Sequence, residues 1–153
     1  MTKEEKEKYE LNLIAFFKFF FTKCNNILKV SNQYIDIGVE YAFDCINRET
    51  SNQTADEAKA ILEGLESMTF EIEDFRYVYD LFLKKYTIHE NWRVRNQAIF
   101  TVGMIATKMC LDVNYQNILN DVYIFIYDPE LKIRRMAVIL FENIFNILPN
   151  YIW

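Results

Sequence analysis

The sequence predicts an all-α fold of about seven helices in one domain that spans residues 1–153. Three observations predict it. The chain has 3 Gly and 2 Pro, whereas strand-rich folds draw on these residues at many turns. Hydrophobic residues recur at spacings of three and four, which places them on one face of a helix. Pairs of helical segments in the second half also repeat their hydrophobic pattern with a fixed offset.

The first predicted helix covers about residues 3–24 and contains the apolar run LNLIAFFKFFF. This run is too short to span a bilayer, and Lys18 interrupts it. Charges of both signs precede the run and no small-residue cleavage site follows it, so we do not expect a signal peptide. We interpret the segment as a buried, aromatic-rich helix, with an interfacial membrane helix as the alternative.

Two further helices complete the N-terminal part, residues 1–70. One covers about residues 28–48, and its predicted apolar stripe is Tyr34, Ile37, Gly38, Tyr41, Ala42, Cys45 and Ile46. The other begins at a capping box, Thr54-x-x-Glu57, and ends near Glu66. We expect these helices to cap the repeated part of the chain.

Residues 71–148 are predicted to form two helical hairpins of one repeated type. The stripe of the first helix is Phe75, Val78, Tyr79, Phe82, Leu83 and Tyr86, and the third repeats it 40 positions later as Tyr115, Ile118, Leu119, Val122, Tyr123 and Ile126. The second and fourth helices match with an offset of 39, from Val94/Ile133 to Ile105/Ile144. We expect the one-residue difference to lie in the turn between the paired helices, where a length change costs little.

The last hairpin resembles the HEAT-repeat signature on a small set of residues: Asp128, Ile133, Arg134, Ala137 and Val138. Val94-Arg95 fits the upstream copy, but His89 stands at the position of the turn Asp, and the frequent Pro of the first helices is absent. The resemblance implies an α-α superhelix in which turn Asp and helix Arg residues form a ladder between stacked repeats. It therefore favours a structural role for Arg95 and Arg134 over contact with a partner.

Catalytic and metal-binding constellations are not evident. The only histidine, His89, precedes a helix and is interpreted as a turn or capping residue. Zinc and di-iron sites need several Cys or His residues or repeated Glu-x-x-His motifs, and neither pattern occurs. We therefore expect no enzyme activity, no metal, no cofactor and no small-molecule ligand. Cys24, Cys45 and Cys110 lie in helical patterns, which is typical of a reducing, cytoplasmic setting.

Acidic residues are concentrated in one part of the sequence. The chain has a formal charge of −5, but residues 36–74 contain 11 acids against 2 bases, and so carry −9. Asp36, Glu40 and Asp44 recur at spacings of four and form one stripe, at a cost to the helix of roughly 0.2–0.5 kcal/mol per like-charged pair. The stripe is either a solvated face or a docking surface for a basic protein. The predicted partner-binding residues are Asp36, Glu40, Asp44, Glu63, Glu66, Glu71, Glu73 and Asp74.

These features favour a protein-binding function. The first hypothesis is an inhibitor that neutralises a basic, nuclease-like toxin, because the chain resembles bacterial immunity proteins in size and charge. A general adaptor or scaffold is the second. The third is a nucleic-acid-binding or DNA glycosylase-type protein, for which the candidate contacts are Trp92, Arg93, Arg95 and Arg135. The acidic net charge disfavours this third function.

Overall fold

The computed structural model of the protein describes residues 1–23, 32–48, 56, 58–59, 62, 72–109 and 115–147. Every regular element in these ranges is helical, which confirms the all-α class. They contain six α-helices, one π-helix and one 3₁₀-helix, compared with about seven predicted helices. Asp56, Ala58, Lys59 and Leu62 are also helical and fall within the third predicted helix. The capping box of that helix, Thr54 and Glu57, lies outside the described residues.

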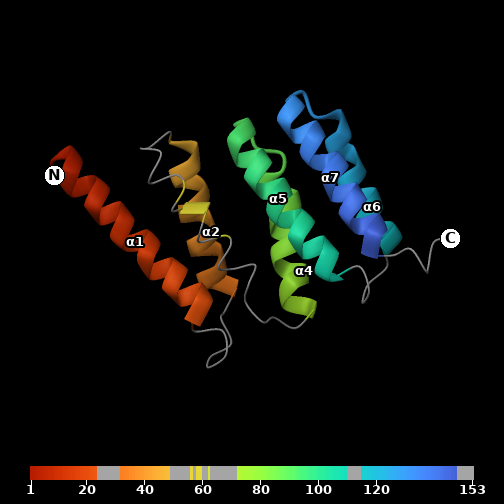
Figure 1. The fold of residues 1–153 in the computed structure, drawn as a ribbon. Coiled ribbons are helices and arrows are strands. Elements are labelled where there is room, and N and C mark those ends of the chain that lie inside the picture. Colours follow the sequence, from red (N-terminus) through yellow and green to blue (C-terminus); the bar gives the residue numbers. More distant parts are fainter. Residues whose placement is uncertain are drawn as a thin grey trace. The chain divides into compact units, whose positions relative to one another are not determined.

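The chain divides into two compact units, Met1–Phe70 and Glu71–Trp153 (Figure 1). This boundary falls where the sequence changes from the predicted capping helices to the repeated hairpins. The assignment of residues 1–153 to one domain, and the capping role of the first unit, stay predictions. Each unit is described by itself below.

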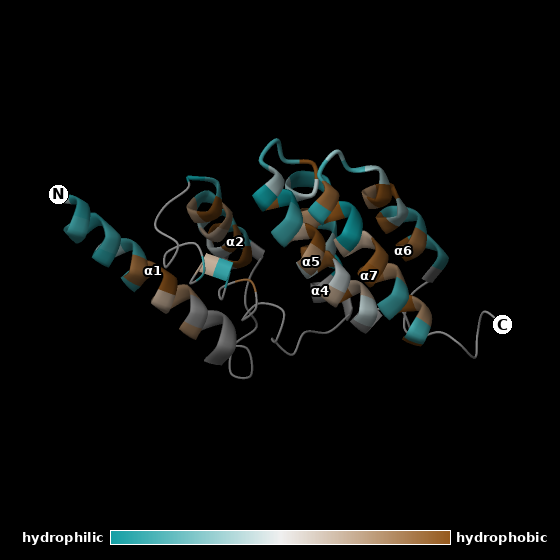
Figure 2. Cartoon of the chain, turned by 45° about the horizontal axis from the view of Figure 1, so that its top comes forward, coloured by the Kyte–Doolittle hydropathy of each residue, from teal (hydrophilic) through white to brown (hydrophobic). Residues whose placement is uncertain are grey.

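The first unit contains α1 (Lys3–Lys23) and α2 (Asn32–Asn47). A capping box begins α1, since the Glu5 backbone N–H donates to Thr2 Oγ1 at 3.2 Å. The Thr2 backbone N in turn donates to Glu5 Oε2 at 2.8 Å. These reciprocal bonds satisfy backbone donors that a helix start leaves unpaired. Figure 2 shows that α1 is hydrophilic over its first turns and becomes hydrophobic toward its middle.

Packing in the first unit differs in part from the predicted stripes. The buried face of α2 contains Ile35, Val39, Ala42, Phe43, Cys45 and Ile46. Ile37 was predicted on that face but is 46% exposed, because a position two residues from both Ile35 and Val39 lies on the opposite side of the helix. In α1, Ile14 is buried, whereas Phe16 and Phe19 are exposed. The prediction of a helix buried through its aromatic residues is therefore wrong for these two side chains.

The second unit consists of two hairpins. The first contains α4 (Ile72–Leu81), a π-helix η1 (Phe82–Tyr86) and α5 (Trp92–Met109). The second contains α6 (Tyr115–Val122), a 3₁₀-helix η2 (Tyr123–Tyr127) and α7 (Leu131–Ile147). In both hairpins the second helix buries matched positions, which are Val94, Ala98, Thr101 and Ile105 in α5 and Ile133, Ala137, Leu140 and Ile144 in α7. The 39-residue offset is thus an offset between equivalent core positions.

The hairpins lie side by side, with α5 along α7 (Figure 1). Tyr79 on α4 donates its hydroxyl to Asp121 Oδ2 on α6 at 3.1 Å, which joins the first helices of the two hairpins. Gly103 of α5 lies close to α7, since a Cβ placed there would lie 2.9 Å from Leu140 Cδ1. A side chain at position 103 would therefore require Leu140 to shift.

The one-residue difference between the hairpins lies in the last turn of their first helices. In η1 the Thr87 N–H donates to the carbonyl of Phe82, five residues earlier, whereas in η2 the Asp128 N–H donates to Phe125, three residues earlier. The wider π turn contains one residue more. Phe82 and Tyr86 are buried four residues apart in the first hairpin, and Val122 and Phe125 are buried three apart in the second. The extra residue therefore precedes the predicted turn.

No described helix is long and apolar enough to cross a membrane.

Candidate functional site

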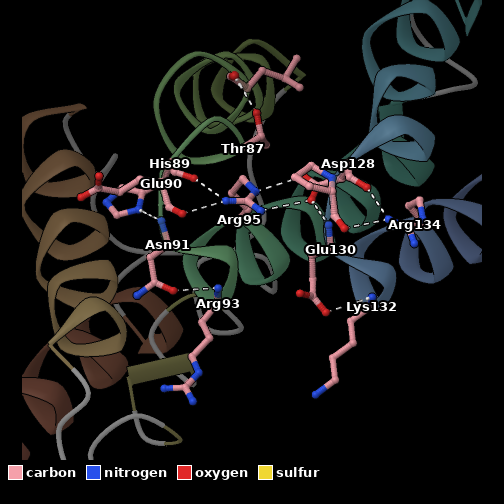
Figure 3. Close-up of polar contacts among 12 residues, drawn as sticks. Thr87, His89, Glu90, Asn91, Arg93, Arg95, Asp128, Glu130, Lys132 and Arg134 are labelled. Carbon is pink, nitrogen blue, oxygen red and sulfur yellow. Dashed lines mark hydrogen bonds and ion pairs between the residues drawn. The ribbon is translucent and has the colours of Figure 1, made fainter.

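A ladder of polar contacts runs between the two hairpins at the start of α5 and α7 (Figure 3). Arg95 Nε donates to Asp128 Oδ2 at 3.0 Å, and Arg95 Nη2 donates to Asp128 Oδ1 at 3.1 Å. The two side chains are only 13% and 10% exposed. A parallel, two-bond contact of this kind fixes the orientation of both groups. Arg95 thus has the bridging role that was predicted for it.

The same turn geometry occurs in both hairpins. Arg95 Nη1 donates to the carbonyl oxygens of His89 and Glu90, at 2.9 and 3.0 Å. Arg134 Nη1 donates in the same way to Asp128 and Pro129, at 2.7 and 2.9 Å. Each donor and acceptor of the second hairpin lies 39 residues after its equivalent in the first hairpin. Both arginines therefore hold the turn that precedes their own helix, and Arg95 also reaches the next hairpin.

His89 takes over part of the role of the turn Asp. Its Nδ1 accepts a hydrogen bond from the backbone N–H of Asn91 at 3.0 Å. Asp128 Oδ1 accepts the equivalent bond from Glu130, also two residues later, at 2.9 Å. The prediction of His89 as a turn residue is confirmed by this bond. The imidazole caps the turn in this way, but it has no carboxylate with which to bind a guanidinium as Asp128 does.

A groove of about 590 Å³ lies between the hairpins next to the ladder. Its lining mixes apolar side chains such as Leu83 and Ile124 with the polar groups of His89, Asp121 and Asp128. Asp121 and Asp128 already accept hydrogen bonds from Tyr79 and Arg95. Within the described residues, no three His, Cys, Asp or Glu side chains are grouped as metal ligands. The groove is therefore a contact region between hairpins whose polar groups serve the fold.

The second candidate is a surface of α2, called here the acidic face, which contains Asp36, Glu40 and Asp44. Glu40 and Asp44 are exposed and Asp36 is half-buried. Among the described residues, Glu40 and Asp44 form no ion pair. Ile37 lies next to them on the same side and is 46% exposed. The helix thus presents one exposed apolar side chain near the exposed carboxylates of Glu40 and Asp44.

Arg48, which follows Asp44 by four residues, donates from Nε to the Asp44 backbone carbonyl at 3.2 Å and forms its ion pair with another helix. Arg48 Nη1 pairs with Glu10 Oε1 on α1 at 2.9 Å, and Glu10 is buried. Arg48 Nη2 lies 3.5 Å from Cys45 Sγ, and Tyr41 donates its hydroxyl to the Glu10 carbonyl at 3.3 Å. Since Arg48 is held in this α1–α2 cluster, its charge does not neutralise the carboxylate of Asp44.

Burial governs the titration of this cluster. It raises the pKa of the Tyr41 phenol, with a further contribution from Cys45. It also raises the pKa of the buried Cys45 thiol, against the opposing effects of Tyr41 and Arg48. Burial alone would lower the pKa of Arg48, but the neighbouring Cys45 and Glu10 raise it overall. Cys45 is therefore an uncharged thiol at neutral pH and a poor nucleophile.

The other predicted partner-binding residues are not all described. Glu63, Glu66 and Glu71 lie outside the described residues, and Glu73 and Asp74 are described only as part of the α4 backbone. The structure therefore brings together three of the eight predicted acids, on α2. Sequence reasoning missed Glu10 and Arg48 as a pair, because 38 residues separate them. The position of Ile37 within the acidic face was also missed, because its spacing fits the buried stripe.

The residues predicted for nucleic-acid contact are distributed over the starts of α5 and α7. Arg93 and Arg135 are exposed, whereas the guanidinium of Arg95 is bound to Asp128. Trp92 is half-buried, with Lys132 Nζ 5.0 Å and the Arg93 guanidinium carbon 5.8 Å from its ring centroid. Two cation–π contacts thus already occupy the indole ring that a base would stack on.

Comparison of the chain with models of protein families, with curated proteins and with solved structures found no significant match.

Proposed function

We propose that this protein is a non-catalytic protein-binding module whose acidic face on α2 docks a basic protein surface. The observation that carries the proposal is the exposed Ile37 bordered by Asp36, Glu40 and Asp44, with the adjacent Arg48 paired to Glu10 instead. An exposed apolar group gains free energy from burial, and the surrounding carboxylates select a partner of opposite charge.

The repulsion between carboxylates, which lowers the stability of α2, supports this proposal. Like-charged carboxylates four residues apart, such as the exposed Glu40 and Asp44, cost a helix roughly 0.2–0.5 kcal/mol per pair. Among the described residues, Arg48, the cation that follows Asp44 in the sequence, is paired with Glu10 on α1. Removal of this repulsion by a basic partner would contribute to binding, and the uniform sign of the face would raise the association rate at low salt.

The repeated hairpins also support a binding role. We propose that residues 71–147 are a pair of HEAT-like repeats, on the basis of the Arg95–Asp128 contact and the 39-residue recurrence of the turn geometry. Repeats of this kind stack into scaffolds with extended binding surfaces. The described side chains form a structural ladder and an apolar core, which is the expected composition of a scaffold.

In its specific form, the proposal is an immunity-type inhibitor of a basic, nuclease-like toxin. The charge of −5, with 11 acids against 2 bases in residues 36–74, supports this form. An adaptor would use the same face without blocking any activity. A nucleic-acid-binding function is less well supported, because Asp128 neutralises Arg95 and cations cover Trp92.

Site-specific photo-cross-linking tests the proposal. A benzophenone amino acid at position 37 should capture a basic protein in an extract of the native source, whereas the same group at Asp80, on α4, should not. Capture of an acidic protein, or equal capture at both positions, would refute the docking surface. If the captured protein has enzymatic activity, titration of that activity with this chain distinguishes an inhibitor from an adaptor. Loss of activity at one-to-one stoichiometry supports the inhibitor, and retained activity supports the adaptor.

A further inference from the structure

The side of α7 that faces away from α5 repeats a buried side of α5. On α5, Trp92 contacts Lys132 of α7, Gly103 approaches Leu140, and Ile99 and Ala106 on the same side are fully buried. The equivalent positions of α7, each 39 residues later, are exposed. Leu131 is 47%, Val138 60% and Phe145 38% exposed, and Glu142 is also exposed. These four residues define the outer face of α7.

The ladder is also incomplete on this side. Arg95 donates from Nη1 to the carbonyls of the turn before its own helix. The other edge of its guanidinium, Nε and Nη2, donates to Asp128. Arg134 makes the same carbonyl contacts through Nη1, but its Nε and Nη2 contact no carboxylate among the described residues. The neighbouring Arg135 is exposed. An apolar stripe therefore lies next to guanidinium groups that can still bind an acid.

The pattern of the outer face is symmetric about Val138. Leu131 lies seven residues before it and Phe145 seven residues after it, while Arg134 lies four before and Glu142 four after. When two copies of a helix pack antiparallel about a two-fold axis, positions equally far before and after the central residue lie opposite each other. Such an isologous contact must be complementary to itself.

We propose that the outer face of α7 binds the same face of a second copy of this chain, antiparallel and with Val138 on the two-fold axis. Leu131 of each copy then lies against Phe145 of the other. Glu142 of each copy lies against Arg134 and Arg135 of the other, which gives the free guanidinium edge its carboxylate. The apolar positions recur every seven residues, the spacing of helices that pack along their length.

The proposed contact is small. Each copy contributes three apolar side chains and one charged pair, and interfaces that bury less than about 1,200 Å² are usually weak or transient. The dimer should therefore form at roughly micromolar or higher concentrations and dissociate on dilution. This inference concerns α7 and is independent of the proposed docking surface on α2.

The full-length chain tests the proposal by sedimentation equilibrium over a dilution series. We expect a monomer–dimer equilibrium whose dissociation constant rises about tenfold or more in Glu142→Lys and in Arg135→Glu. The double variant E142K/R135E exchanges the charges and should restore most of the affinity. Retained thermal stability of the single variants, followed by circular dichroism, shows that a lost dimer does not reflect a lost fold.

A cysteine at the axis provides a second readout. Val138→Cys should form a disulfide-linked dimer on oxidation, because an axial residue faces its own copy. Asn143→Cys, exposed on another side of α7, should cross-link no more than the wild-type chain. A wild-type chain that stays monomeric at all concentrations, or equal cross-linking at positions 138 and 143, would overturn the proposal. Slow maleimide labelling of Cys introduced at 138 in such a monomer would show that another part of the chain covers the face, and would overturn it as well.

Discussion

Arg95 and Asp128 are joined by two parallel N–H···O bonds of 3.0 and 3.1 Å, although 33 residues separate them. Asp128 belongs to the turn of the second hairpin, and Arg95 belongs to the second helix of the first. The pair therefore fixes the register in which the hairpins stack. Both side chains are largely buried, so removal of either charge leaves the other without a partner.

Asp128→Asn tests the contribution of this pair. Asparagine keeps an oxygen for the Glu130 N–H but removes the charge that faces Arg95. We expect the free energy of unfolding to fall by about 3–5 kcal/mol, measured by guanidinium titration. Arg134→Gln is the control, since it removes two carbonyl contacts and no described ion pair, and it should cost about 1 kcal/mol. Equal losses in the two variants would show that the charge pair adds nothing to the turn contacts.

The close approach of α5 and α7 predicts a coupled pair of substitutions. Gly103→Val should destabilise the second unit by about 1–3 kcal/mol, because its side chain meets Leu140 Cδ1. Leu140→Ala alone should cost about 2–5 kcal/mol through the cavity that it leaves. In the double variant the valine side chain at position 103 fills part of that cavity, so the combined loss should be smaller than the sum of the two single losses. Additive losses in a double-mutant cycle would contradict this packing.

The π turn of the first hairpin predicts a tolerated deletion. Removal of the exposed Lys84 should convert η1 into a narrower turn and bring Phe82 and Tyr86 to the three-residue spacing of Val122 and Phe125. We expect the stability to change by about 1 kcal/mol or less. Deletion of Gln97 within α5 is the control, because it rotates all later core positions and should abolish cooperative unfolding of this unit. Comparable damage from both deletions would refute the equivalence of the two turns.

The cluster between α1 and α2 predicts a loss of stability at alkaline pH. The pKa values of Tyr41 and Cys45 are raised in the folded protein, whereas an unfolded chain ionises these groups near their usual values of about 10 and 8.5. The unfolded state therefore releases these protons first, and the free energy of unfolding falls as pH rises above about 8.5. The contribution is fully present below that pH.

Chemical denaturation of the wild type and of a Tyr41→Phe/Cys45→Ala variant between neutral pH and about pH 11 measures this effect. The variant should lose less stability over that range, because it lacks both groups. Parallel pH profiles would show that the two raised pKa values do not contribute to the alkaline loss.

The sequence predicted the fold well where spacing alone determines burial. The offset of 39 between Val94 and Ile133 identified equivalent core positions, and the Arg95 contact followed from the turn motif. Sequence reasoning failed where burial depends on what another helix covers. Ile37 keeps the three- and four-residue spacing to Tyr34 and Tyr41, yet it lies opposite the buried Ile35 and Val39 and is 46% exposed. The Glu10–Arg48 pair was missed because no local pattern links residues from two different helices.

The acidic face of α2 is the central claim, and the association rate with the cross-linked partner tests it most directly. Stopped-flow or surface plasmon resonance measurements would compare the wild type with Asp36→Lys/Glu40→Lys/Asp44→Lys. The control, Glu4→Lys/Asp80→Lys/Glu90→Lys, changes the net charge equally at dispersed exposed positions. The α2 variant should keep its fold, associate at least about tenfold more slowly, and lose the salt dependence of the wild type. An unchanged rate in a folded α2 variant, or an equal reduction in the control, would contradict the account.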